Sequence, residues 1–204
     1  APGLKYLLRI AKKHGITGPL LTFGNQDIYA TREDVVRWME EYGLPIGRPT
    51  GIHPSTSSGL TKINKESERF IHARTFFEYL GIPSSMYFDI DKFEFDAPQI
   101  VHDLERPIDA RYHDSFNFVL DSGTMEHIFD VKAVMQNIVR ITKVGGHVLQ
   151  MIPAQNYLNH GFYQMSPTLF YDFYTANGLE IVESHIIEVR GSTYRFHRYD
   201  QERD

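Results

Sequence analysis

The side chains best suited to chemistry follow one predicted strand in the second half of the chain. The apolar run 116–120 predicts a buried strand, and Asp121-Ser122-Gly123 comes directly after it. Open α/β sheets bind their ligands at the carboxyl ends of such strands. His127 and His160 lie further along, and because imidazole titrates near neutral pH, either could remove a proton from a bound substrate. Each also has a structural alternative, His127 as part of the turn before a helix and His160 as a loop residue held by backbone.

The elements that must position these residues alternate along the chain. Short apolar runs predict strands over 19–23, 86–90, 100–102, 116–120, 146–152 and 180–189. Apolar residues three and four apart predict helices over 3–14, 31–42, 64–80, 130–141 and 168–177. Thr31 is the expected cap of the second helix, and Asp34 completes a capping box. This alternation predicts an α/β fold, with a mostly parallel central sheet and helices on both faces, in a single domain over residues 1–204.

Two segments stand outside this pattern. Residues 44–63 have no period and are rich in proline and glycine, which predicts either a lid or a disordered segment. Near the end of the chain, Thr193–Tyr199 could add a last, antiparallel strand to the sheet, and the sequence leaves this open.

The order of motifs between Phe116 and Pro153 is similar to that of a known family. After the predicted strand come Met125-Glu126-His127, a helix, the turn Lys143-Val144-Gly145-Gly146 and a strand that ends in Pro153. This order resembles the class I S-adenosylmethionine (SAM)-dependent methyltransferases of the methyltransferase type 11-like group, and is similar to those found with polysaccharide- and sugar-modifying enzymes. In that group a Leu-Glu-His-like step follows the fourth strand, and a Lys-Pro-Gly-Gly turn ends the next helix. The resemblance implies a Rossmann-like fold and SAM as the cofactor.

The resemblance also implies where the cofactor binds. In the family a Gly-x-Gly-x-Gly turn follows the first strand, an acidic residue ends the second strand and binds the ribose hydroxyls, and a residue after the third lies beside adenine. The corresponding first turn here, Phe23-Gly24-Asn25-Gln26-Asp27, has one glycine, and Asn25 is expected to take a left-handed conformation in place of a second. Asp121 has the alternative of capping a local turn. The implied cofactor contacts are Gly24, Asn25, Asp89, Asp91, Asp103, Leu104, Asp121, Ser122 and Gly123.

The segment 159–167 resembles the part of the family that faces the acceptor. The resemblance implies that the acceptor contacts are Glu126, Asn159, Tyr163 and Gln164, that His127 and His160 are catalytic, and that the acceptor is a small polar molecule, namely a hydroxyl of a sugar or related metabolite. Small-RNA 2′-O-methyltransferases are similar at this step, and bind a divalent ion through a Glu-x-x-Glu-His step and a later histidine. The earlier glutamate falls on Gly123 here, so one ligand is missing and we expect no metal ion. The alternative stays open that Glu126, His127 and His160, as three nitrogen and oxygen ligands with an open position, hold an ion.

Composition limits the partners. The net charge of -5 and the pI near 6.1 leave no basic footprint, which disfavours nucleic acid as a partner. The chain has no cysteine, so disulfides, cysteine nucleophiles and thiolate metal sites are excluded. There is no apolar run of bilayer length and no signal-peptide pattern at the N-terminus. We therefore expect a cytoplasmic protein without a membrane partner.

Two other functions agree with the same predicted fold. The single glycine in the first turn is also consistent with a non-catalytic methyltransferase-like domain that serves as a structural or interaction module. A nicotinamide-dependent oxidoreductase shares the sheet class, but the first strand is not followed by Gly-x-Gly-x-x-Gly. The sequence does not indicate whether oxygen, nitrogen or carbon is methylated, or the oligomeric state.

Overall fold

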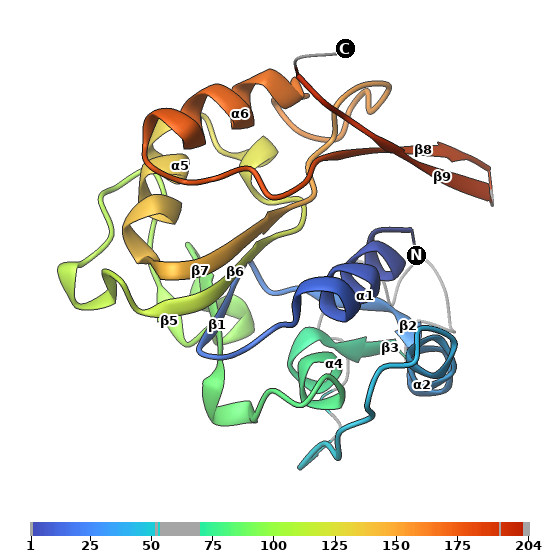
Figure 1. Ribbon diagram of the computed structural model, residues 1–204. Helices are drawn as coiled ribbons and strands as arrows, with labels where there is room; N and C mark the ends of the chain where they lie inside the picture. Colours follow the sequence, from blue (N-terminus) through green and yellow to red (C-terminus); the bar gives the residue numbers. More distant parts are fainter. Residues whose placement is uncertain (1, 52, 54–69, 192, 202–204) are drawn as a thin grey trace.

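The computed structural model describes residues 2–51, 53, 70–191 and 193–201, and a parallel five-stranded sheet lies at its centre (Figure 1). The middle strand is β1 (Leu20–Phe23). It is flanked on one side by β4 (Tyr87–Asp91) and then β5 (Ile100–Val101), and on the other by β6 (Phe116–Asp121) and then β7 (Thr142–Gln150). The chain therefore builds the sheet outward from β1 in one direction and then in the other, which is the topology of Rossmann-like α/β folds. The predicted fold class is confirmed.

Alternate residues of the central strands face two separate cores, as the two-residue period of a strand requires. Leu20 and Phe118 belong to the core that includes α1 (Pro2–His14) and α4 (Ala73–Tyr79). Leu21 belongs to the core that includes α5 (Val131–Ile141), against which α6 (Pro167–Ala176) also packs. Helices therefore cover both faces of the sheet, as predicted (Figure 1). Within the described residues, no helix combines the length and apolar character needed to cross a bilayer.

The chain makes a long excursion between β1 and α4. It leaves the sheet through β2 (Asp27–Thr31), continues into α2 (Arg32–Glu41) and returns as β3 (Phe70–His72), which pairs antiparallel with β2. The predicted helix over 64–80 is therefore corrected: within the described residues, 70–72 form a strand and the helix begins at Ala73. The apolar spacing of this segment is helical, but cross-strand pairing with β2 decides its conformation.

The two ends of this excursion match local signals in the sequence. The Thr31 hydroxyl accepts a hydrogen bond from the Asp34 backbone and the Asp34 carboxylate accepts one from the Thr31 backbone, so the predicted capping box is confirmed. The described part of the predicted 44–63 loop packs along α4, where Thr50 donates to the Glu78 carboxylate at 2.6 Å. Residues 52 and 54–63 lie outside the described residues, so the choice between a lid and a disordered segment stays open.

The C-terminal strands form a hairpin of their own. β8 (His185–Arg190) and β9 (Thr193–Arg198) pair antiparallel in a two-stranded sheet that is separate from the central one, and the hairpin projects from the body in Figure 1. Tyr6 of α1 holds its base, because the phenol contacts the imidazole of His185 at 2.9 Å. The last strand is therefore present and antiparallel, but it does not join the central sheet. The predicted strand over 180–189 begins only at His185.

Candidate functional site

The turn after β1 shows where its single glycine is needed. Gly24 has a φ of +73°, and its N–H donates to the Ile90 carbonyl of β4 at 2.8 Å. A Cβ at this position would lie 3.1 Å from the Thr124 hydroxyl and 3.9 Å from Oδ2 of Asp91. Glycine therefore provides both the left-handed backbone and a close approach of the chain ends after β1, β4 and β6.

Residues from a distant part of the sequence pack against this turn and complete it. The Gln26 carbonyl accepts from the Ala73 N–H at 3.0 Å, which joins the end of β1 directly to the start of α4. Asn25 does not take the left-handed conformation that we expected; its side-chain oxygen is instead hydrogen-bonded to Nε2 of His72. His72 Nδ1 accepts from the Arg74 N–H, so Nε2 carries the hydrogen. Burial lowers the His72 pKa to about 4, which keeps this ring neutral at neutral pH.

Only one of the two acidic residues of β4 faces this turn. Asp91 accepts from the Phe93 N–H through Oδ1 at 3.0 Å, while its other oxygen lies near Gly24. Asp89 is buried, accepts from the Gln99 N–H at 2.8 Å and has its pKa raised by burial. The Asp91 carboxylate thus lies beside the first turn, whereas Asp89 holds the β4–β5 connection together.

Of the two residues expected beside adenine, Asp103 lies at the surface and Leu104 lies in the interior. Asp103 forms an ion pair with Lys92 at 2.9 Å, which lowers the pKa of the Asp103 carboxyl. Leu104 is buried in the core, and its carbonyl accepts from the amide of Asn137. Leu104 therefore contributes to packing, and Asp103 alone of the two has a side chain at the surface.

Asp121 caps the turn that carries the predicted catalytic residues. Its Oδ1 accepts from the N–H groups of Thr124 and Met125, and its Oδ2 accepts from the Gln150 amide at 3.2 Å. These bonds hold the start of a short 3₁₀ turn, Met125–His127. The side chain is fully buried, and burial raises its pKa to about 6. The alternative that Asp121 caps a local turn is confirmed, and its contribution to the site is to fix Glu126 and His127 in place.

The substitution Asp121→Asn is expected to change how stability depends on pH. The Asp121 pKa rises from its ordinary 3.8 to about 6 in the folded chain. The folded state therefore keeps a proton that the unfolded state has released between about pH 4 and pH 6. Stability from this group is present below about pH 4 and is lost as the pH rises through about 6, a loss of about 3 kcal/mol. Asparagine does not titrate, so the Asp121→Asn variant should not show this loss of stability between about pH 4 and pH 6.

Urea unfolding at about pH 4 and pH 7 measures this difference. The wild type should lose stability relative to Asp121→Asn on going to the higher pH. Asp130→Asn is the matched control, because Asp130 also caps a backbone N–H, that of Ala133 at 2.9 Å, but is exposed. Equal pH dependence of the wild type and Asp121→Asn would mean that the buried carboxyl titrates normally.

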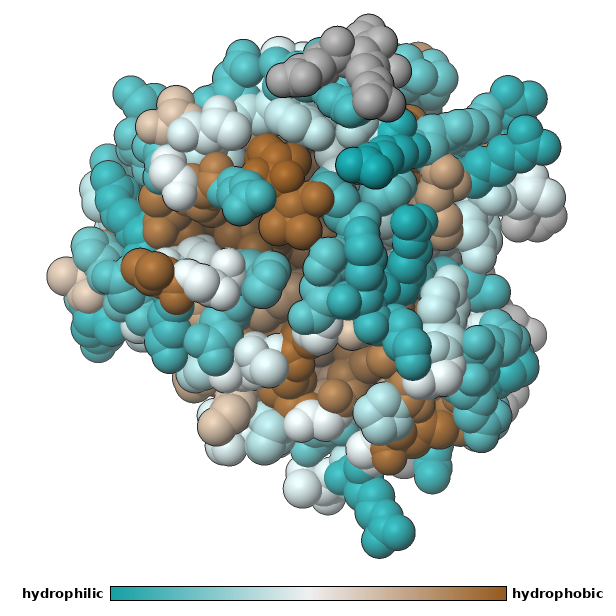
Figure 2. Space-filling model, viewed as in Figure 1, coloured by the Kyte–Doolittle hydropathy of each residue, from teal (hydrophilic) through white to brown (hydrophobic). Residues whose placement is uncertain are grey.

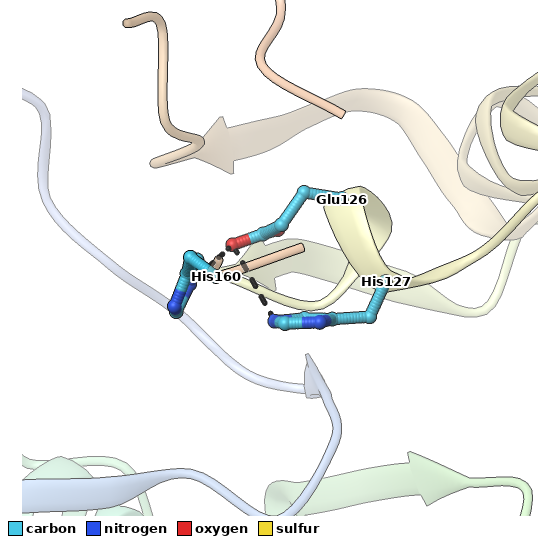
Figure 3. A group of neighbouring side chains, drawn as sticks. All are labelled: Glu126, His127 and His160. Carbon is cyan, nitrogen blue, oxygen red and sulfur yellow. Dashed lines mark hydrogen bonds and ion pairs between the residues drawn. The ribbon is translucent and has the colours of Figure 1, made fainter. Parts of the chain in front are cut away.

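Glu126, His127 and His160 come together at the end of this turn (Figure 3). Oε1 of Glu126 lies 3.3 Å from Nε2 of His160 and 3.9 Å from Nε2 of His127, and Figure 3 shows this oxygen directed between the two imidazoles. The two rings are 4.9 Å apart between centroids. Glu126 is fully buried, whereas each histidine side chain is nearly half exposed. The structure thus brings together the three residues that we call the Glu-His-His cluster.

A returning loop supplies His160 to this cluster. The Glu126 carbonyl accepts from the N–H groups of Phe162 and Tyr163, at 2.8 and 3.2 Å. A Cβ on Gly161 would lie 2.7 Å from that carbonyl oxygen, so only glycine allows the loop to approach so closely. Asn159 precedes this contact in a left-handed conformation, with a φ of +60°.

The other predicted acceptor contacts are partly engaged within the protein. The Tyr163 hydroxyl donates to the Phe129 carbonyl at 3.1 Å, and the Gln164 side-chain oxygen accepts from the Tyr157 N–H at 3.0 Å. Sequence reasoning missed Tyr157, an exposed aromatic residue whose ring is nearly perpendicular to that of His160, with 4.9 Å between the centroids. Its position three residues before His160 is the signal that could have drawn attention to it.

A groove of about 1860 Å³ connects these two halves of the site. Its walls include Asn25 and Gln26 from the first turn, Ser122 and Gly123 after β6, and Glu126, Tyr157 and His160 at the cluster. On the face of the molecule that Figure 2 draws, apolar side chains gather in hollows among polar ones. The groove extends well beyond these residues, because parts of β7 and of the segment 177–189 also line it. Its volume therefore exceeds the roughly 300–1,000 Å³ of a usual small-molecule site.

No protein-family model matches the chain, and no curated protein matches it. Among solved structures, the chain is similar to the CMeT domain of the citrinin polyketide synthase, with 15% identity and a TM-score of 0.43 over 89% of this chain and 45% of that one. It is also similar to the YcgJ protein of Bacillus subtilis, with 14% identity and a TM-score of 0.42 over 92% of this chain and 72% of that one. The match therefore spans less than half the length of the first of these chains. The fold assignment rests on the strand order itself.

Proposed function

We propose that the chain is a SAM-dependent methyltransferase that acts on a hydroxyl of a small polar acceptor, such as a sugar or related metabolite. The observation that carries this proposal is the groove that joins the Gly24 turn to the Glu-His-His cluster at the carboxyl edge of the sheet. Open α/β sheets bind ligands at this edge, beside the strand where the direction of growth reverses. SAM supplies an electrophilic methyl group when it is bound there.

The residues around Gly24 fit such a cofactor. Because the glycine has no Cβ, the side chains of Thr124, Gln26 and Asp91 can lie close to the backbone of this turn. Oδ1 of Asp91 is committed to the Phe93 N–H, while Oδ2 remains on the side of the turn. A fixed carboxylate of this kind can accept hydrogen bonds from ribose hydroxyls. Ser122 and Gly123 after β6 line the groove, as do Asn25 and Gln26 of the first turn.

The Glu-His-His cluster is suited to remove the proton of the acceptor hydroxyl. In the protein without a bound ion, Nε2–H of His160 donates to Oε1 of Glu126 at 3.3 Å, which leaves Nδ1 of the same ring to accept the proton of the acceptor hydroxyl as the oxygen gains its bond to the methyl carbon. The Glu126 carboxylate, 3.3 Å away, then stabilises the imidazolium. Because Glu126 is buried under the 159–163 loop, its charge is poorly screened and acts strongly on the ring.

Exposed aromatic rings beside the cluster support a small cyclic acceptor. Phe129 and Phe162 stack at 4.1 Å between centroids and are 65% and 59% exposed. Tyr157 adds a third exposed ring against His160. Flat apolar faces next to hydrogen-bonding groups are what a sugar ring requires, because a sugar has an apolar face and a polar edge.

Titration calorimetry with SAM and with its demethylated product tests the proposal. We expect both to bind, and Asp91→Asn to weaken binding by about 10- to 100-fold, because a charge-assisted hydrogen bond is lost. Asp109→Asn is the matched control: Asp109 also accepts from the N–H two residues ahead at 3.0 Å, but on an exposed turn. If neither compound binds at high concentration, the chain is instead a non-catalytic domain of this fold.

A further inference from the structure

We propose that Glu126, His127 and His160 bind one divalent transition-metal ion through Oε1 and the two imidazole nitrogens. Oε1 lies 3.3 Å and 3.9 Å from the two Nε2 atoms, and one ligand atom from each residue can be chosen so that all lie within 4.8 Å of one another. This site goes beyond methyl transfer, because binding of an ion by the cluster does not depend on SAM. It also departs from the expectation of no metal that followed from Gly123.

One of the spacings between ligand atoms already fits a common coordination geometry, and the others are within reach of it. Metal–nitrogen and metal–oxygen bonds of about 2.0–2.2 Å place neighbouring ligands of a tetrahedral ion about 3.3–3.6 Å apart. The Glu126–His160 distance of 3.3 Å already has this value. The His127 distance of 3.9 Å is slightly longer, and this side chain is 44% exposed, so rotation of the ring can shorten it.

The charge of the cluster also favours a cation. Glu126 is fully buried, and its Oε2 has no hydrogen-bond partner among the described residues. A buried carboxylate is costly unless a positive charge or hydrogen bonds compensate it. The two neighbouring imidazoles are charged only when protonated. A divalent ion bound to neutral imidazoles would supply the missing positive charge.

The backbone holds the carboxylate rigidly while leaving room around it. Asp121 caps the turn that carries Glu126, and the 159–163 loop is hydrogen-bonded to the Glu126 carbonyl. Gly123 has no side chain to fill the space beside Oε1, since a Cβ there would lie 3.2 Å from this oxygen. One fixed oxygen ligand and two imidazoles that can adjust form a preorganised site.

The type of ligand selects the class of ion. Two imidazole nitrogens and one carboxylate oxygen suit zinc, cobalt, nickel or ferrous iron better than magnesium or calcium, which prefer oxygen ligands. Three protein ligands leave a further coordination position open. Glu126 and His160 both line the groove, so this position is accessible to a small molecule. That the small molecule is the methyl acceptor rests on the proposed function.

Metal titration of the untagged, chelator-treated protein tests the site with Co²⁺ and Zn²⁺ as probes. We expect one Co²⁺ per chain, visible d–d absorption of the kind that nitrogen ligands give, and displacement by Zn²⁺. His127→Ala and His160→Ala should each weaken binding by at least about tenfold. Because both side chains are nearly half exposed, these variants are expected to fold, which circular dichroism checks.

His197→Ala is the matched control. His197 also pairs with a glutamate, Glu188, at 3.1 Å, but at an exposed site where the carboxylate is shared with Arg190. The His197→Ala substitution should therefore leave Co²⁺ binding unchanged. Equal Co²⁺ affinity of the wild type and His160→Ala, or absence of Co²⁺ absorption, would overturn the proposal. SAM affinity is measured on the same samples, so failure of ion binding and failure of cofactor binding are separate results.

Discussion

Replacing either His127 or His160 by alanine is expected to lower the rate of methyl transfer by about 10²- to 10⁴-fold and to leave SAM affinity within about twofold. Nε2 of each ring lies within 4 Å of the buried Glu126 oxygen, and Glu126 and His160 line the groove. The cofactor side, formed by Gly24 and Asp91, is built from other elements. His160 accepts the proton in the proposed step, and His127 enters as the second nitrogen ligand of the proposed ion, so loss of either imidazole affects the acceptor side and not the binding of SAM.

The two substitutions distinguish proton transfer from ion binding. If the cluster binds an ion through both rings, turnover with radiolabelled SAM should fall by similar factors in His127→Ala and His160→Ala. A loss confined to His160→Ala would agree with proton transfer by the Glu126–His160 pair alone and would contradict the ion. His113→Ala, at an exposed histidine outside the cluster, should retain full activity. Full activity in both cluster variants would remove these histidines from the reaction.

The elements of the fold could be predicted where the signal is local. The apolar run of β6 and the capping box of Thr31 and Asp34 involve neighbouring residues, and both occur as the sequence indicates. The 64–80 segment shows the limit of such reasoning. Its apolar spacing fits a helix, but residues 70–72 pair with β2, a contact between distant segments that no local pattern reports.

The same distinction applies to the site. The order of Asp121, Glu126 and His127 after one strand indicated correctly that these residues share one end of the sheet. That the first turn is completed by Ala73 and His72 was hidden, because the chain makes its excursion between Gln26 and Ala73. The sequence also could not predict that Asp89 and Leu104 are buried, because their burial depends on how the β4–β5 connection and Asn137 pack against them.

The substitution Gly161→Ala is the smallest change expected to take the Glu-His-His cluster apart. A Cβ at this position would lie 2.7 Å from the Glu126 carbonyl oxygen and 2.8 Å from Glu126 Cγ. The Glu126 turn cannot retreat easily, because Asp121 caps it and a buried network holds Asp121. The 159–163 loop must therefore move away and carry His160 with it. A displacement of about 1 Å at a reacting group costs on the order of 100-fold in rate, and the strain costs about 1–3 kcal/mol of stability.

Turnover, Co²⁺ binding and urea unfolding of this variant measure the three consequences separately. Gly51→Ala is the matched control, because its added Cβ would meet its nearest neighbour, His53, only at 4.0 Å and its backbone is not left-handed. Wild-type turnover and Co²⁺ affinity in Gly161→Ala would mean that the loop tolerates a side chain and that His160 acts without its close approach to Glu126. Loss of both with stability reduced by no more than about 3 kcal/mol would show that the glycine holds the cluster together and is not needed for the fold as a whole.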